Sequence, residues 1–193
     1  MNICVYGASS SEIDKKYIIA TENFGEYFAK RGHNLVFGAG GSGLMGAAAR
    51  GVKKGGGKIF GFIPEFFVKE NIEELFDNCS ELVFTKDMAE RKANMEDKAD
   101  AFVIVPGGIG TFEEFFQVLT LKQLGRHTKP IAIYDIDGYY KELTEFMDKS
   151  SQKKFIKDAC KSLYFYSDNP DKIIEYIEND NQNEINVHDM KFS

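Results

Sequence analysis

The chain has 193 residues, enough for one compact domain, and 43% of them are hydrophobic and 28% charged, as in soluble globular proteins. The formal net charge of -6 argues against a nucleic-acid binder, because phosphate backbones demand a basic surface. No apolar run approaches the ~20 residues of a membrane span, and a short apolar strand stands where a signal peptide would, so we expect a cytoplasmic protein without membrane contact.

Seven short runs of β-branched and aromatic residues alternate with helical patterns along the chain. They predict strands at residues 2–7, 34–40, 58–64, 81–85, 101–108, 130–135 and 162–167. Helices are predicted between them at residues 12–31, 43–53, 86–98, 110–124, 138–149 and 170–178. This order predicts an α/β fold with a doubly wound, mainly parallel sheet and helices on both faces. We expect one domain over residues 1–180 and a polar C-terminal extension over residues 181–193.

Cysteine and histidine are too few and too scattered to predict a metal site. An odd number of cysteines without pairwise ligand spacing favours reduced, structural thiols over disulfides or a zinc site. The histidines likewise lack the spacing of metal ligands or of a catalytic triad. We therefore expect no metal and no other cofactor. These residues are Cys4, Cys79, Cys160, His33, His127 and His188.

Two glycine loops follow predicted strands, at the sheet edge where ligands of such folds bind. In the first, GAGGSGLMG at residues 38–46, glycines such as Gly41 and Gly43 allow backbone amides to approach an anion at a helix N-terminus. Tight packing of a helix on the sheet explains this loop equally well. The second, PGGIGT at residues 106–111, is again a glycine-rich segment between a predicted strand and a predicted helix, and two such loops together favour binding of a nucleotide phosphate. Ser9, in GASS after the first strand, adds a hydroxyl at the same edge, although serines before helices are often caps.

Two acids follow the second glycine loop, in the segment TFEEFF. The spacing from Thr111 to Glu114 fits a capping box, in which the acid satisfies backbone donors. We expect Glu113 and Glu114 in the first turn of a helix, where they would repel a bound phosphate unless they face another part of the ligand, such as a sugar. Carboxylates assist glycosyl transfer by stabilising an oxocarbenium-like transition state or by deprotonating water. Capping and catalysis both remain open for Glu114.

The apolar positions of this helix are more numerous than one face requires. A stripe at helical spacing is widened by further apolar residues, which predicts burial by the sheet and by a second subunit. Gly125 is the expected end of the helix. The apolar positions are Phe112, Phe115, Phe116, Val118, Leu119 and Leu121.

An arginine interrupts the inward face of the preceding predicted helix. Met88, Arg91 and Met95 share one face by their spacing. An inward cation needs an anionic partner, because burying it unpaired is costly. A bound phosphate or Glu114 would supply that partner. The alternatives are a rotated, exposed helix and a structural ion pair.

Together these motifs resemble the Lonely Guy (LOG) family of cytokinin riboside 5'-monophosphate phosphoribohydrolases, often labelled lysine decarboxylases. PGGIGTFEE at residues 106–114 resembles the family signature PGGxGTxxE, ERKANM at 90–95 resembles its RKxxM segment, and the match covers roughly residues 1–160. The resemblance implies a Rossmann-like nucleotide-binding domain, usually a homodimer, that hydrolyses the N-glycosidic bond of cytokinin ribotides or AMP to free base and ribose 5-phosphate. A non-catalytic nucleotide-binding or carrier protein of the same fold is the alternative.

Carried over by motif, the resemblance makes Glu114 the catalytic carboxylate and Arg91 its partner. It also implies substrate contacts at Lys92, Gly108, Ile109, Gly110, Thr111, Phe112, Glu113 and Thr120. Two stretches depart from the family pattern. Ala89 stands where members commonly carry histidine, and residues 64–82 align poorly, so we expect base recognition to differ there.

Overall fold

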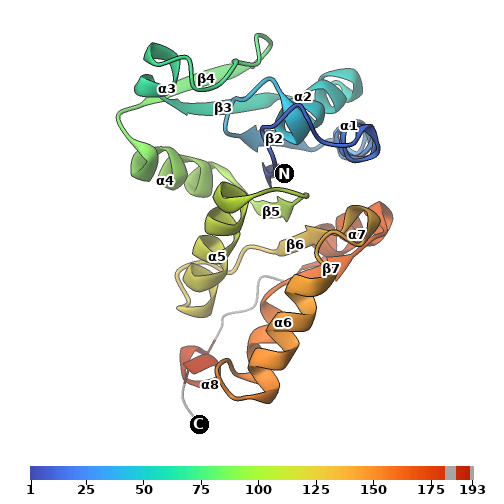
Figure 1. Cartoon of the computed structure of the whole chain (residues 1–193), viewed down its shortest axis with the longest axis vertical. Coiled ribbons are helices and arrows are strands. Elements are labelled where there is room, and N and C mark those ends of the chain that lie inside the picture. Colours follow the sequence, from blue (N-terminus) through green and yellow to red (C-terminus); the bar gives the residue numbers. More distant parts are fainter. Residues whose placement is uncertain (181–185, 192–193) are drawn as a thin grey trace.

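All seven predicted strands form one sheet, in which every pair of neighbouring strands is parallel (Figure 1). The structure is a computed structural model that describes residues 1–180 and 186–191. The strand order is β4-β3-β2-β1-β5-β6-β7, so the predicted α/β fold with a parallel sheet is confirmed. The strands are β1 (Asn2–Tyr6), β2 (Asn34–Phe37), β3 (Ile59–Pro64), β4 (Glu81–Thr85), β5 (Ala101–Ile104), β6 (Ile131–Tyr134) and β7 (Phe165–Ser167).

The six predicted helices are also present, with ends that shift by a few residues. Gly125 follows the fifth with a φ of 65° and donates its N–H to the Lys122 carbonyl, as expected of a helix end. These helices are α1 (Lys15–Lys30), α2 (Gly43–Gly55), α4 (Met88–Lys98), α5 (Ile109–Gln123), α6 (Lys141–Gln152) and α7 (Pro170–Asn179). The short helices α3 (Glu65–Lys69) and α8 (Val187–Lys191) and the 3-10 helices η1 (Ile136–Gly138) and η2 (Asp158–Leu163) were not predicted, because they span too few residues to show a periodic pattern.

The sheet separates two hydrophobic cores. Ile3 and Val5 of β1 face the core covered by α1, α2 and α7, whereas Cys4 and Tyr6 face the core covered by α4, α5 and α6. Successive residues of a strand point to opposite faces, so a strand buried on both sides is apolar at every position. This explains the unbroken apolar runs in the sequence.

The predicted polar extension, residues 181–193, lies partly outside the described residues, which exclude 181–185 and 192–193. Its described part includes α8. Met190 of this helix packs on the core beside α5, and the Met190 carbonyl accepts a hydrogen bond from the Gln123 side chain. The three cysteines are free thiols. No helix among residues 1–180 and 186–191 combines the length and apolar character needed to cross a bilayer.

The strand order reverses at β1, which pairs with β2 on one side and with β5 on the other. The chain leaves β1 toward α1 and leaves β5 toward α5, and these helices lie on opposite faces of the sheet. The two loops therefore diverge and open a crevice at the carboxyl ends of the strands. GASS and PGGIGT, which the sequence singles out, are these two loops.

Candidate functional site

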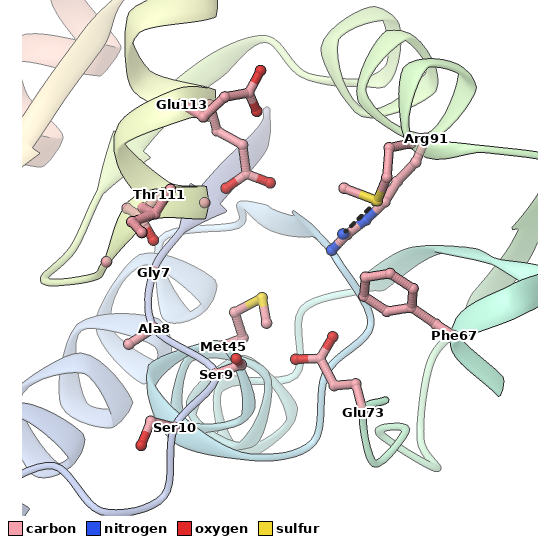
Figure 2. Close-up of a pocket in the computed structure, with 15 residues that line it drawn as sticks. Gly7, Ala8, Ser9, Ser10, Met45, Phe67, Glu73, Arg91, Thr111 and Glu113 are labelled. Carbon is pink, nitrogen blue, oxygen red and sulfur yellow. Dashed lines mark hydrogen bonds between the residues drawn. The ribbon is translucent and has the colours of Figure 1, made fainter. Parts of the chain in front are cut away.

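A cavity of about 390 Å³ occupies this crevice. Its walls come from the loop after β1, the start of α5, the inner face of α4, and the segment after β3 (Figure 2). Eight of the residues proposed from sequence line it: Ser9, Arg91, Gly108, Ile109, Gly110, Thr111, Glu113 and Glu114. Residues up to 105 positions apart in the chain are thus brought together at one edge of the sheet.

The start of α5 differs from the sequence-based expectation. Its N-cap is Gly108, and the buried Thr111 is the third helical residue, so a capping box from Thr111 to Glu114 is wrong. Thr111 instead packs on Gly107, where a Cβ would overlap its side chain. The helix begins at Ile109, so its first N–H groups lack intrahelical acceptors and border the cavity.

The earlier helix start moves both acids out of the first turn, which contains no acidic residue. Glu113 is exposed and forms an ion pair with Lys92, whereas Glu114 is half-buried. Burial raises the pKa of Glu114 to about 7, although the positive charge of Arg91 opposes the rise. Neither acid therefore occupies the anion-binding end of the helix, and Glu114 is poised to exchange a proton near neutral pH.

Arg91 is 5% exposed, so the predicted inward face of α4 is confirmed. Its Nε donates to the Phe62 carbonyl at 3.1 Å, and its Nη2 donates to the Gly38 carbonyl at 3.2 Å. Phe62 belongs to β3, and Gly38 directly follows β2. A Cβ on Gly38 would overlap Nη2, so glycine at this position makes room for the guanidinium. The described hydrogen-bond partners of Arg91 are all uncharged, which leaves its charge available to an anion in the cavity.

The first glycine loop serves packing more than ligand contact. The Gly41 N–H donates to the Glu74 carbonyl at 2.6 Å, and a Cβ on Gly46 would overlap the Gly41 carbonyl. Gly43 has a φ of 58° and packs on the backbone of the loop after β1. Neither Gly41 nor Gly43 lines the cavity, so their role in substrate binding stays a prediction without support from their placement.

Three further residues proposed from the family resemblance also lie outside the cavity. Phe112 packs against Tyr140 with ring centroids 6.2 Å apart, on the core side of α5. Lys92 is held by Glu113. Thr120 is exposed two turns further along α5. Their contacts with substrate stay predictions.

Sequence reasoning missed the wall formed by Met45, Phe67 and Glu73. Glu73 is half-buried, and its Oε1 is fully buried without a hydrogen-bond partner among the described residues. Burial raises the pKa of Glu73, and Arg91 opposes this rise. No local signal marks Glu73, because it is one of several acids in a segment without periodicity. The poor fit of residues 64–82 to the family pattern was the one indication that this region matters.

Comparisons with known proteins agree with this architecture. The family model described as "Possible lysine decarboxylase" matches residues 45–177. The probable cytokinin riboside 5'-monophosphate phosphoribohydrolase LOGL6 of Oryza sativa subsp. japonica is 35% identical, over 91% of this chain and 70% of that protein. The cytokinin riboside 5'-monophosphate phosphoribohydrolase LOG7 of Arabidopsis thaliana is 36% identical, over 91% of this chain and 80% of that protein.

Among solved structures, the molybdenum cofactor carrier protein of Chlamydomonas reinhardtii superposes with a TM-score of 0.70 and 22% identity, over 92% of this chain and 95% of that one. At this identity the likeness shows a common Rossmann-like fold only. The family model and the plant relatives together cover most of the chain. The chain therefore belongs to the LOG family, which the family model describes as possible lysine decarboxylases.

Proposed function

We propose that the protein is a nucleoside 5'-monophosphate phosphoribohydrolase that cleaves the N-glycosidic bond of cytokinin ribotides or AMP. The products are the free base and ribose 5-phosphate. The observation that carries the proposal is the convergence of Arg91, Glu114 and the start of α5 on one cavity. The plant relatives are named for this activity, which supports the same substrate class.

The phosphate would bind at the start of α5. The free N–H groups of the first turn and the partial positive charge of the helix end attract an anion. Ser9 contributes from the facing loop, and no acid stands in the first turn to repel the phosphate. The conflict between acids and phosphate in the sequence is thereby removed.

Glu114 would act on the water that attacks ribose C1'. A carboxylate with a pKa of about 7 accepts a proton efficiently near neutral pH, and its charge stabilises the oxocarbenium-like transition state. Arg91 keeps part of this carboxyl ionised through its nearby positive charge. Because Arg91 is fixed by two backbone carbonyls, it is positioned before substrate arrives.

We further propose a homodimer that packs through the outer face of α5. Phe116, Thr120 and Leu124 follow one another at four-residue spacing and are all exposed. Phe116 and Leu124 present apolar side chains there, and exposed apolar side chains that lie close together are typical of an interaction surface. Free thiols suit the reducing cytoplasm, and we expect neither nucleic acid nor membrane as partner.

The test is release of base from AMP and from isopentenyladenosine 5'-monophosphate by purified protein, followed by liquid chromatography. We expect turnover of at least one substrate, and losses of about 100-fold or more in Glu114→Gln and Arg91→Ala. Glu145→Gln removes an exposed carboxylate on α6 and is the control. Tight binding with recovery of intact nucleotide would support a carrier and contradict an enzyme.

A further inference from the structure

Hydrolysis of an N-glycosidic bond moves two protons. The attacking water loses one, and the leaving base gains one at a ring nitrogen. Glu114 accounts for the proton of the water, but a second group must serve the base. Glu113 is a poor candidate because it is exposed and paired with Lys92. Among the described residues, the remaining carboxyl in the wall of the cavity is Glu73.

Glu73 stands at the end of the cavity that suits a base. Phe67 and Glu73 lie across the cavity from Thr111, which marks the phosphate end (Figure 2). Met45 and Met88 also line the cavity, and the Arg91 guanidinium lies over the Phe67 ring, 5.6 Å from its centroid. Aromatic and thioether groups pack well on the faces of a flat, polarizable base.

The segment that carries Glu73 is fixed to the first glycine loop. The Gly41 N–H donates to the Glu74 carbonyl at 2.6 Å, and the Phe76 N–H donates to the Ala39 carbonyl at 2.9 Å. The Glu73 Oε1 rests on Gly40, where a Cβ would overlap it. These contacts hold the carboxyl against the wall of the cavity. They also explain two glycines of the loop, since Gly38 makes room for Arg91 and Gly40 makes room for Glu73.

We propose that Glu73 is a second catalytic residue, the acid that protonates the leaving base. This inference rests on the proposed hydrolase function. The carboxylic acid of Glu73 gives its proton to a ring nitrogen while the electron pair of the C1'–N bond passes to the base. The water oxygen bonds to C1' and its proton goes to Glu114. Solvent then returns a proton to Glu73 and takes one from Glu114. In sum, one nucleotide and one water are converted to the free base and ribose 5-phosphate.

The burial of Glu73 disfavours the charged form of its carboxyl. Its Oε1 is buried without a hydrogen-bond partner among the described residues, a costly place for a full negative charge. Across the cavity, the positive charge of Arg91 on α4 favours ionisation of Glu73, and the negative charge of Glu73 in turn raises the pKa of Glu114 on α5. Burial outweighs Arg91 and raises the pKa of Glu73.

The test compares two leaving groups. AMP needs a proton on its base, whereas 4-nitrophenyl β-D-ribofuranoside 5-phosphate releases a stable nitrophenolate without one. We expect Glu73→Gln to lose about 100-fold or more in kcat on AMP but less than about fivefold on the nitrophenyl substrate. Glu114→Gln should lose activity on both. Glu74→Gln changes the exposed neighbouring carboxylate and should retain activity on both substrates.

A loss of equal size on both substrates would overturn the acid role and make Glu73 a binding or positioning residue. The wild-type protein supplies a second measurement that needs no variant. Its activity on AMP should fall at alkaline pH as Glu73 ionises, and its activity on the nitrophenyl substrate should not. Identical alkaline limbs would overturn the inference and leave the proposed function standing. A wild-type protein that cleaves neither substrate would overturn both.

Discussion

Replacing Glu114 with glutamine should stabilise the folded protein at alkaline pH while it abolishes activity. The carboxyl is half-buried, and burial raises its pKa from 4.5 to about 7. In the unfolded chain the group ionises near its ordinary pKa. The folded state therefore binds more protons between the two values, and the free energy of unfolding falls as pH rises through this window. Glutamine has nearly the same shape and carries no charge.

The size of the effect follows from the two pKa values, 4.5 and about 7. Because the folded state binds the proton more tightly, ionisation of Glu114 lowers the free energy of unfolding by about 1 kcal/mol at pH 5 and by about 3 kcal/mol at pH 8. From pH 5 to pH 8, the free energy of unfolding of Glu114→Gln should thus rise by about 2 to 2.5 kcal/mol relative to that of the wild type. For a chain of this length that corresponds to roughly 5 to 10 °C in Tm.

Urea unfolding followed by circular dichroism at pH 5 and pH 8 measures this difference. Glu113→Gln is the matched control, because its exposed carboxylate on the same helix should change stability by less than about 1 kcal/mol at either pH. A stability difference between Glu114→Gln and wild type that is the same at both pH values would refute the reasoning. It would mean that Glu114 is not desolvated in the folded state.

Three further changes test other parts of the structure. Gly38→Ala places a Cβ where the Arg91 guanidinium lies, so kcat/KM should fall by about 100-fold while the circular dichroism spectrum stays the same. A fully active variant would contradict the position of Arg91 against Gly38. Burial lowers the pKa of His127 to about 4, so protonation below its ordinary pKa of 6.5 costs stability. Between pH 7 and pH 4.5 the free energy of unfolding, measured in urea, should fall by about 2 kcal/mol less in His127→Gln than in the wild type. An equal fall in both proteins would contradict the lowered pKa of His127. Phe116→Glu should yield a folded monomer in sedimentation experiments, whereas an unchanged dimer would exclude the outer face of α5 as the interface.

The sequence predicted the elements well because their signals are local. A strand buried on both faces shows an apolar run of a few residues, and a helix shows a stripe within about fifteen residues. All seven strands and six helices were found this way. The capping box failed because α5 begins at Ile109 with Gly108 as its N-cap, two residues before Thr111. That choice depends on the packing of Thr111 against Gly107 and leaves no mark in the spacing of residues.

The candidate site was predicted in part. Arg91 stood out because it interrupts an apolar helix face, and Glu114 because it follows a glycine loop and matches the family signature, and both residues line the cavity. Glycine-rich loops attracted attention to Gly41 and Gly43, but the structure uses these glycines for contacts with neighbouring backbone. Glu73 escaped notice because its environment is created by Gly40 and Arg91, which lie 33 and 18 positions away in the chain.

By itself, the sequence determined the order of strands and helices, the two glycine loops at residues 38–46 and 106–111, and the pair of Arg91 and Glu114 as the residues to examine. These features depend on residue types and on spacings within single elements. Only the tertiary structure decided that β1 and β5 are neighbours, that Glu114 is half-buried and Glu113 exposed, and that Glu73 completes the wall of the cavity. Burial and charge at a site are sums over groups from several elements, so they exist only once the sheet has brought these elements together.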